Sequence, residues 1–198
     1  MLILASSSPR RLELLTQIGF KPDVVVGADI DETPKKSEKP TDYAARLGKE
    51  KAAVVAAKYD DGIIIAADTM VALGRRIIGK AENAAGAIKD LTLMQGRSHR
   101  VYTGMSIIKK QGGKIAQTSN KLVCTKVKFK RMSADEIKWY VNTGEWEGKS
   151  GSFTLMGIAS GFIEEVSGSH TNIVGLPLCE ARNVLIGMGM FPKLAEKP

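Results

Sequence analysis

The alternation of hydrophobic and polar positions divides the first third of the chain into strands and helices. Apolar runs at residues 2–5 and about 23–27 are short enough for strands, whereas apolar residues recur at helical spacing over 9–19 and about 41–59. The run 62–67 is continuously apolar and rich in isoleucine, which is typical of a strand covered on both faces. This order predicts strands that alternate with helices.

The rest of the chain adds antiparallel strands to this pattern. Residues 70–79 predict a hairpin, and 99–130 predict strands joined at the Gly112-Gly113 turn. The Gly-rich segment 168–175, GSHTNIVG, predicts a tight loop. Further helices are expected over about 82–95, 133–141 (opened by the capping box SADE) and 176–190. We therefore expect a single α/β domain over residues 1–198 with a mixed sheet.

Composition supports an ordinary globular chain. It is 43% hydrophobic and 25% charged, and no apolar run approaches the roughly 18 residues of a membrane span. The first residues lack the basic leader of a signal peptide. The two cysteines, Cys124 and Cys179, form neither a disulfide framework nor a metal-binding spacing. We expect a reducing cytoplasm and no membrane partner.

A formal net charge of +8 favours an anionic partner, which could be nucleic acid, a membrane surface or a phosphorylated small molecule. Part of the excess has the pattern of solvated charge, namely residues 35–39, 126–131 and 193–198. Aromatic residues make up only 6% of the chain, without the interleaved platform that single-stranded nucleic acid requires. Nucleic acid is therefore the less favoured partner.

Two arginines stand at an unfavourable position in the first predicted helix. Ser8 is a good N-cap and Pro9 a good first residue, which places Arg10 and Arg11 in the first turn. There the helix dipole disfavours a cation by roughly 0.3–1 kcal/mol. A bound phosphate would remove the conflict. The alternative is two surface arginines that tolerate a small penalty.

Lys51 lies in the centre of the apolar stripe of the helix predicted over 41–59. Its ammonium group either extends to the rim of the buried surface or points into a cavity at an anion. The pattern of the helix leaves both readings open.

Carboxylates occur where a ligand could be met. Asp68 and Thr69 are expected at the end of the buried strand 62–67, a position from which α/β sheets contact ligands. Glu32, with Asp29 and Asp31 in one acidic loop, could join Asp68 around a hard cation such as Mg²⁺. The alternative for Asp68 is a turn or cap residue.

Single lysines and histidines add little by themselves. Lys80 and Lys149 each follow a glycine, where backbone can approach a ligand closely. His99 and His170 have no partners at metal or triad spacing, and no phosphate-binding glycine motif occurs in its required setting. Together, the cations and carboxylates favour phosphoryl chemistry.

Eight short motifs occur in order from about residue 2 to 188. They are LASSSPRRLELL, DIDETP, RLGKEKA, AADTMV followed by GK, GRSHRVYTG, VKFKRMSADEIKWYVNTGE, GKSGSF and GSHTNIVGLPL. In this combination the sequence resembles the Maf proteins, once called septum-formation inhibitors. The resemblance implies a nucleoside triphosphate pyrophosphatase that releases a nucleoside monophosphate and pyrophosphate, with roles in nucleotide house-cleaning and cell-division arrest. It also implies a divalent cation (Mg²⁺ or Mn²⁺), a cytoplasmic homodimer, and a twisted mixed sheet flanked by helices. Two lobes would surround a central cleft, similar to inosine triphosphatases.

The resemblance also assigns residues to roles. The family's phosphate-binding turn, lysines and carboxylates fall on Ser6, Ser8, Arg10, Arg11, Glu32, Lys51, Asp68, Lys80 and Lys149. Asp68 takes the place of the general base and, with Glu32, would hold the metal. Ala81 stands after Lys80 where the family has proline.

Substrate choice in the family follows three positions, which are Arg10, Thr69 and Met156 here. The dTTP/UTP type has Arg, Thr and Gln, and the 7-methyl-GTP type has Trp, Gln and Glu. This chain follows the first type except at Met156, whose thioether cannot replace an amide at a base edge. The alternative function is a non-catalytic regulator of division or a basic nucleic-acid binder.

Overall fold

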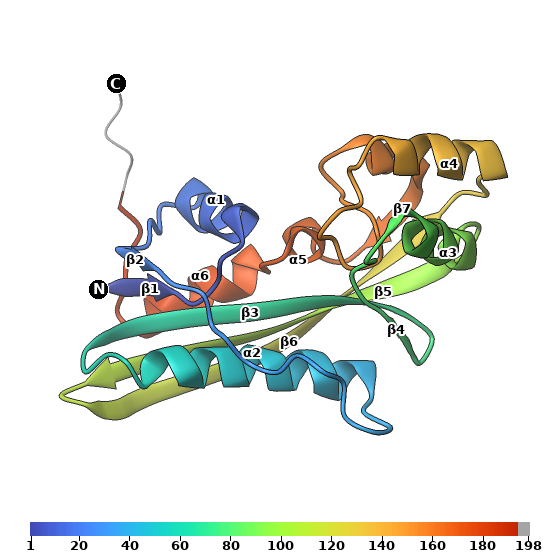
Figure 1. Ribbon diagram of the computed structural model, residues 1–198. Coiled ribbons are helices and arrows are strands. Elements are labelled where there is room, and N and C mark those ends of the chain that lie inside the picture. Colours follow the sequence, from blue (N-terminus) through green and yellow to red (C-terminus); the bar gives the residue numbers. More distant parts are fainter. Residues whose placement is uncertain (194–198) are drawn as a thin grey trace.

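The computed structural model describes residues 1–193, and its strands and helices succeed one another along the chain as Figure 1 shows. In order they are β1 (Leu2–Leu4), α1 (Pro9–Gln17), β2 (Val24–Val25), α2 (Pro40–Ala56), β3 (Gly62–Leu73), β4 (Arg76–Ile78), α3 (Ala84–Met94), β5 (Ser98–Gln111), β6 (Lys114–Phe129), α4 (Ala134–Asn142), η1 (Ile158–Phe162), β7 (Ile163–Ser167), α5 (His170–Val174) and α6 (Leu178–Gly187). The charged tail expected at 193–198 lies, apart from Lys193, outside the described residues.

The strands form one mixed sheet. Within the described residues its order is β2-β1-β3-β5-β6-β7, and β4 pairs with β3. β1 is parallel to both neighbours, with Leu4 opposite Val25 of β2 and Ile65 of β3. β3, β5, β6 and β7 are antiparallel to one another in that order. The predicted α/β class with a mixed sheet is confirmed.

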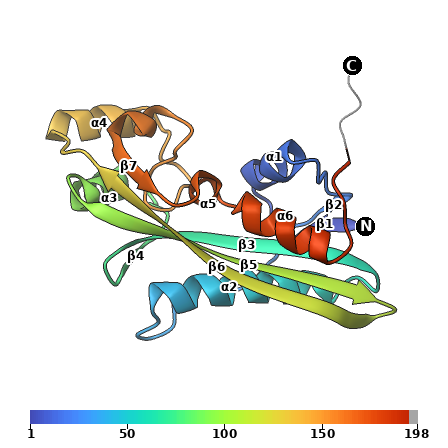
Figure 2. The same cartoon turned by 180° about the vertical axis from the view of Figure 1, so that it is seen from behind.

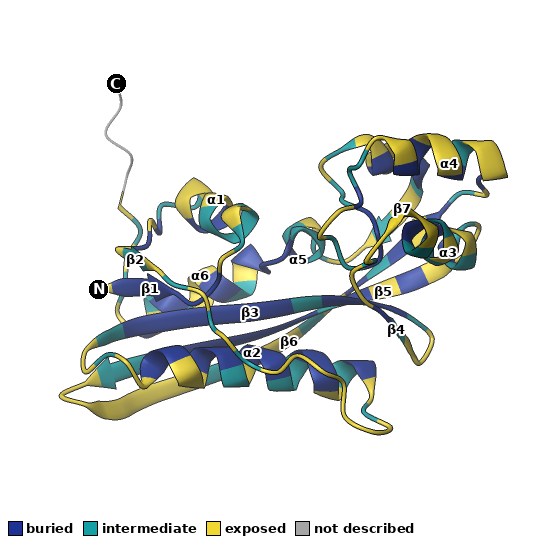
Figure 3. Ribbon diagram, viewed as in Figure 1, coloured by how far each residue is buried: buried dark blue, intermediate teal, exposed yellow. Residues whose placement is uncertain are grey.

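Helices cover both faces of the sheet (Figures 1 and 2). α2 packs on one face against Ile64 and Ala66 of β3, and α1 and α6 pack on the other against Ile63 and Ile65. Successive side chains of a strand point to opposite faces, so a strand covered on both sides needs apolar residues throughout. Figure 3 accordingly shows β3 buried along most of its length.

A second lobe lies at the N-terminal end of β5 and the C-terminal end of β6 (Figure 1). It contains α3, α4, η1 and β7. Its core joins Leu91 of α3, Phe129 of β6 and Tyr140 of α4. α4 opens with the predicted capping box, in which Ser133 Oγ accepts from the Glu136 N–H and the Glu136 carboxylate accepts from the Ser133 N–H. The expected arrangement of two lobes on one sheet is confirmed.

The strand predicted over 62–67 is longer in the structure and changes the place of Asp68. β3 continues to Leu73 and pairs with β5 throughout, with Asp68 opposite Gly104. The expectation that Asp68 ends a strand was wrong. Polar residues interrupt the apolar run at this point, and they remain in the strand because each has a buried polar partner.

The segment predicted as a tight loop contains a short helix. Residues 170–174 form α5, whose N-cap Ser169 accepts a hydrogen bond from the Asn172 N–H at 3.2 Å. β7 (Ile163–Ser167), which directly precedes this segment, was not predicted. The loop prediction for GSHTNIVG was wrong because the S-x-x-N cap is a weaker signal than the surrounding glycines.

His99 is a buried, uncharged member of the second lobe's core. Its side chain is 1% exposed, and neither ring nitrogen has a hydrogen-bond partner within residues 1–193. Burial lowers the pKa of His99 to about 4, whereas the unfolded chain retains a pKa of about 6.5. The unfolded state therefore binds more protons between these values. Stability is complete above pH 6.5 and decreases as the pH falls toward 4.

Because of this histidine, we expect the free energy of unfolding to fall by about 2 kcal/mol when the pH is lowered from 8 to 5. Urea unfolding of wild type and His99→Leu at both pH values would measure it. On acidification, the free energy of unfolding should fall less in the variant than in wild type, and the difference should be about 2 kcal/mol. An equal loss in both proteins would show that His99 does not titrate in this range.

Candidate active site

A cavity of about 550 Å³ opens at one edge of β3. β1 pairs with this edge as far as Ala5, whose N–H donates to the Ile65 carbonyl, and β4 takes up the edge again from Val71. Between these two pairings, and among residues 1–193, β3 has no strand neighbour on this edge, while β5 remains paired with its other edge. β1 is also the strand at which the chain turns from one direction across the sheet to the other, and such switch points are where α/β sheets bind ligands.

The turn between β1 and α1 forms one wall of the cavity. Ser6 is buried, and its Oγ accepts from the Ser8 N–H at 3.2 Å and from Arg11 Nη1 at 3.0 Å. Ser8 is the N-cap residue, as predicted, but its hydroxyl makes no capping hydrogen bond. Arg10 also lines the cavity.

Arg11 is held inside the cavity by neutral groups. Its Nε donates to the Gly175 carbonyl at 2.8 Å, and its Nη2 donates to Thr69 Oγ1 at 3.3 Å. Among residues 1–193 no carboxylate lies within salt-bridge distance of it. Burial lowers the pKa of Arg11, and the charge of Asp68 opposes that shift. A fixed guanidinium without a direct counter-ion is suited to an anionic ligand.

Lys51 points into the cavity, which decides between the two readings of the α2 stripe. Its side chain is 10% exposed, and Nζ lies 2.5 Å from Asp68 Oδ1 and 2.6 Å from Glu32 Oε1. Of the two readings left open by the sequence, the structure agrees with the one in which the ammonium group points into a cavity, and its direct partners are carboxylates. Burial acts to raise the pKa of Glu32, but the hydrogen bond and charge of Lys51 outweigh burial, and the pKa is lowered.

Asp68 and Thr69 reach the cavity from opposite faces of β3. Asp68 meets Lys51 on the α2 face, while Thr69 Oγ1 lies 2.8 Å from Thr103 Oγ1 on the α5 face. The cavity can receive both because it lies at the unpaired edge, where the two faces meet. The tertiary structure therefore brings the polar pair into one site.

An isolated β-bridge joins two further segments that line the cavity. Lys80 and Ser150 form an isolated antiparallel bridge, and Ser150 Oγ donates to the Thr69 carbonyl at 3.2 Å. Lys80 is exposed, and Lys149 Nζ donates to the Glu147 carbonyl at 2.8 Å. Both lysines line the cavity.

Most of the predicted site residues line this one cavity. They are Ser6, Ser8, Arg10, Arg11, Glu32, Lys51, Asp68, Thr69, Lys80 and Lys149. Met156 does not line it and is 76% exposed, so its role in base selection stays a prediction. Asp29 and Asp31 are exposed in the acidic loop outside the lining.

The sequence analysis did not identify several lining residues. Tyr43 donates its hydroxyl to the Glu32 carbonyl at 2.8 Å and so supports the acidic loop. Phe153 enters from the segment between α4 and η1, and Gly175 from the C-terminal end of α5. The sequence cannot distinguish an aromatic side chain that lines a site from one that is buried in the core, because both follow the same apolar pattern.

The carboxylates fit a cation that is shared with a ligand. Within residues 1–193 no group of three His, Cys, Asp or Glu side chains could hold a metal ion. Glu32 and Asp68 nevertheless converge on one atom, Lys51 Nζ. Mg²⁺ commonly takes one or two carboxylates and completes its shell with water and substrate phosphates. The two side chains therefore fit such a metal.

No helix in the described part of the chain is long and apolar enough to cross a membrane.

Known proteins match nearly the full length of the chain. The sequence model described as Maf-like protein matches residues 1–188. The dTTP/UTP pyrophosphatase of Caulobacter vibrioides is 49% identical over 191 residues, covering 96% of this chain and 97% of that protein. The dTTP/UTP pyrophosphatase of Rhizobium etli is 50% identical over 194 residues, covering 95% and 92%. Among solved structures, a HAM1 protein from Coxiella burnetii aligns with a TM-score of 0.41 at 12% identity, over 66% of this chain and 73% of that chain.

Proposed function

The chain belongs to the Maf-like protein family, and from that premise we propose that it is a nucleoside triphosphate pyrophosphatase. It hydrolyses the bond between the α- and β-phosphates and releases a nucleoside monophosphate and pyrophosphate. The observation that carries the proposal is the grouping of Arg11, Lys51 and Asp68 around one cavity. Cations for a polyphosphate and a carboxylate for water then occupy the same space.

Each group has a part in this reaction. The triphosphate lies along the Ser6–Arg11 turn, where Arg11 is already oriented by neutral partners. Lys80 and Lys149, which line the cavity at and beside the Lys80–Ser150 bridge, neutralise phosphate charge. Lys51 holds the Asp68 carboxylate in place. Fixed charges of this kind need no reorganisation during the reaction.

Asp68 acts as the general base. Its carboxylate accepts a proton from the attacking water, and the water oxygen bonds to the α-phosphorus. The bond between the α-phosphorus and the bridging oxygen breaks, so that pyrophosphate leaves with that oxygen. A divalent cation, Mg²⁺ or Mn²⁺, held by Glu32 and Asp68 together with the phosphates, would neutralise charge on the triphosphate.

We propose dTTP and UTP as the preferred substrates. Relatives with nearly half of their residues identical carry the name dTTP/UTP pyrophosphatase. Arg10 and Thr69 line the cavity and agree with that type. Met156 departs from it, so we expect weaker discrimination among bases than an amide at that position would give. A cytoplasmic homodimer belongs to the same proposal.

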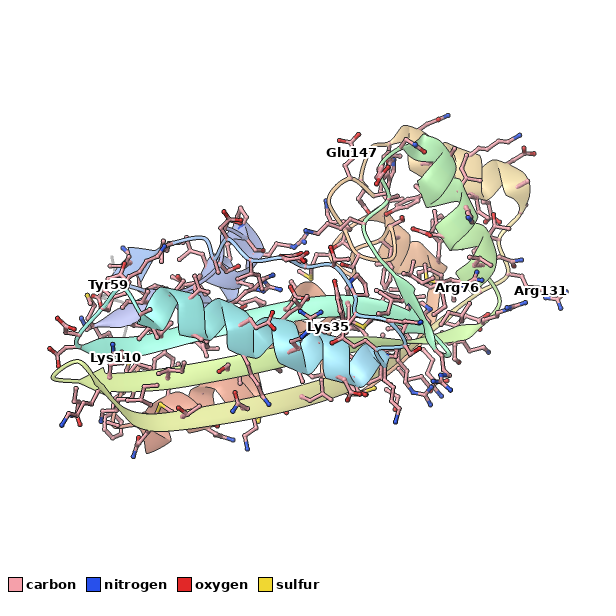
Figure 4. All side chains as sticks on the ribbon, turned by 60° about the horizontal axis from the view of Figure 1, so that its bottom comes forward. Lys35, Tyr59, Arg76, Lys110, Arg131 and Glu147 are labelled. Atoms are coloured by element: carbon pink, nitrogen blue, oxygen red, sulfur yellow. The ribbon has the colours of Figure 1, made fainter. Side chains whose placement is uncertain are left out.

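The distribution of charge does not favour the nucleic-acid alternative. Figure 4 shows Lys35, Lys110 and Arg131 on separate parts of the surface. A nucleic-acid-binding face instead gathers its lysines and arginines into a patch or stripe. These three cations do not share one face, whereas Arg10, Arg11, Lys51, Lys80 and Lys149 line the same cavity.

A pyrophosphate-release assay tests this function. Purified protein with Mg²⁺ or Mn²⁺ would be offered dTTP, UTP, CTP, ATP, GTP and 7-methyl-GTP. We expect equal amounts of monophosphate and pyrophosphate, with dTTP and UTP turned over best, and loss of turnover when EDTA is added. Release of single phosphate, or no turnover combined with salt-sensitive binding of nucleic acid, would contradict the proposal.

A further inference from the structure

The cavity has two apolar walls on opposite faces of β3, and Arg11 of the phosphate turn contacts β3 on one of these faces, at Thr69. On the α2 face the wall comprises Tyr43, Met70 and Ile77; on the α5 face it comprises Val71, Val101, Phe153 and Ile173. A site for a nucleotide needs a charged part that binds the phosphates and an apolar part that contacts the face of the base. The two walls are therefore the two candidate base sites.

The wall at Phe153 continues directly from the turn. Arg11 donates to Thr69 Oγ1, and Val71 follows two residues later on the same face of β3. A nucleotide whose phosphates lie at Arg11 can place its base along this face without crossing the sheet edge. This continuity favours the α5 face.

On the opposite face, the side chains beside the apolar wall are already paired with one another. Glu32, Lys51 and Asp68 form an ion triad on that face. The ring of Tyr43 lies under the Arg46 guanidinium, 5.6 Å from centroid to Cζ, and its hydroxyl is bonded to the Glu32 carbonyl.

Phe153 is held by two aromatic neighbours. Its ring centroid lies 5.2 Å from His99 and 5.0 Å from Phe129, at interplanar angles of 78° and 77°. These edge-to-face contacts fix the orientation of the ring. Phe153 is 5% exposed, and the small part of it that is not covered by the core lines the cavity. An ordered aromatic surface beside a polyphosphate site is suited to a nucleobase.

The backbone before Phe153 is strained. Ser152 is fully buried at φ +59°, a left-handed conformation that a side chain with a Cβ disfavours. Gly151 precedes it at φ +73°, and a Cβ there would lie 2.8 Å from Val71 Cγ2. Ser152 Oγ donates to Asp90 Oδ2 of α3 at 2.9 Å. This hydrogen bond ties the strained turn to a helix of the second lobe.

We propose, on the basis of the proposed hydrolysis, that Phe153 forms the wall of the nucleobase subsite and that Ser152 and Asp90 are positioning residues that hold its ring there. Neither Ser152 nor Asp90 needs to touch substrate. Because every base presents an apolar face, this wall contributes affinity for a nucleotide over a bare polyphosphate rather than a choice among bases.

Two ligands separate the base from the phosphates. The α,β-methylene analogue of dTTP carries both, and inorganic tripolyphosphate carries only the phosphates. Calorimetric titration with Mg²⁺ would give both affinities for each variant. For Phe153→Leu we expect affinity for the analogue to fall about tenfold, and affinity for tripolyphosphate to remain unchanged.

Paired variants test the positioning residues. Ser152→Ala keeps the strained backbone and loses the hydroxyl, so it should lose affinity for the analogue alone. Asp90→Leu removes the acceptor and should behave likewise, whereas Asp90→Asn keeps an amide oxygen that can accept the bond and should bind as wild type does. Thermal melting of each variant confirms that it folds.

Two further variants serve as controls for the phosphate site and for the opposite wall. Arg11→Ala should weaken both ligands, and Ile77→Ala probes the opposite wall. The subsite is overturned if wild type binds the two ligands equally, if Phe153→Leu changes the ratio of affinities by less than about twofold, or if Ile77→Ala changes it instead. The positioning role is overturned if Asp90→Asn and Asp90→Leu bind alike. Absence of pyrophosphate release by wild type would refute the proposed hydrolysis separately, because the binding ratio would still decide the subsite.

Discussion

Replacing Asp68 with asparagine is expected to lower the turnover number for pyrophosphate release by about 10²–10⁴-fold. The amide has the same shape as the carboxylate but cannot accept a proton from water at neutral pH. Lys51 keeps its second carboxylate partner, Glu32, at 2.6 Å, so the fold and the position of the lysine should survive.

Steady-state kinetics with dTTP and UTP would measure this loss, and thermal melting would confirm the fold. Asp29→Asn is the matched control because Asp29 lies in the acidic loop, exposed and outside the cavity lining. It should keep wild-type turnover. If Asp68→Asn retained full activity, the role of Asp68 as general base would be wrong.

Gly104→Ala is expected to lower the free energy of unfolding by about 3 kcal/mol or more. α2 crosses β5 with two glycines in contact. A Cβ on Gly104 would lie 1.9 Å from the Ala44 carbonyl oxygen, and one on Gly48 would lie 2.4 Å from the Gly104 oxygen. Both obstacles are backbone atoms, so the helix must move away from the sheet as a unit. Lys51 lies on that helix, so the site would shift as well.

Urea unfolding of the two proteins would measure the difference. Gly187→Ala in α6 is the matched control, because a Cβ there meets nothing within 4 Å and its φ is not positive. That change should be neutral, or stabilising by up to about 1 kcal/mol through higher helix propensity. A loss below about 1 kcal/mol for Gly104→Ala would show that α2 can adjust easily.

One part of the candidate site could be predicted from a short segment, because two cations there lie at the positive end of a helix dipole. Arg10 and Arg11 in a first helical turn favoured either a bound phosphate or two surface arginines that tolerate a small penalty, and both residues line the cavity. Lys51 was ambiguous because a helix stripe shows which face is buried but not what faces it. The ion pairs to Asp68 and Glu32 required the packing of α2 on β3.

The sequence by itself determined the alternation of strands and helices, the capping box at Ser133, and the basic turn before α1, because each depends on neighbours within a few residues. Only the tertiary structure decided that Asp68 lies inside β3, that it shares a cavity with Thr69 from the opposite face, and that Phe153 reaches the same space. These placements depend on the length of β3 and on the gap between β1 and β4 along its edge. Both result from pairing between residues far apart in the chain, which no local pattern records.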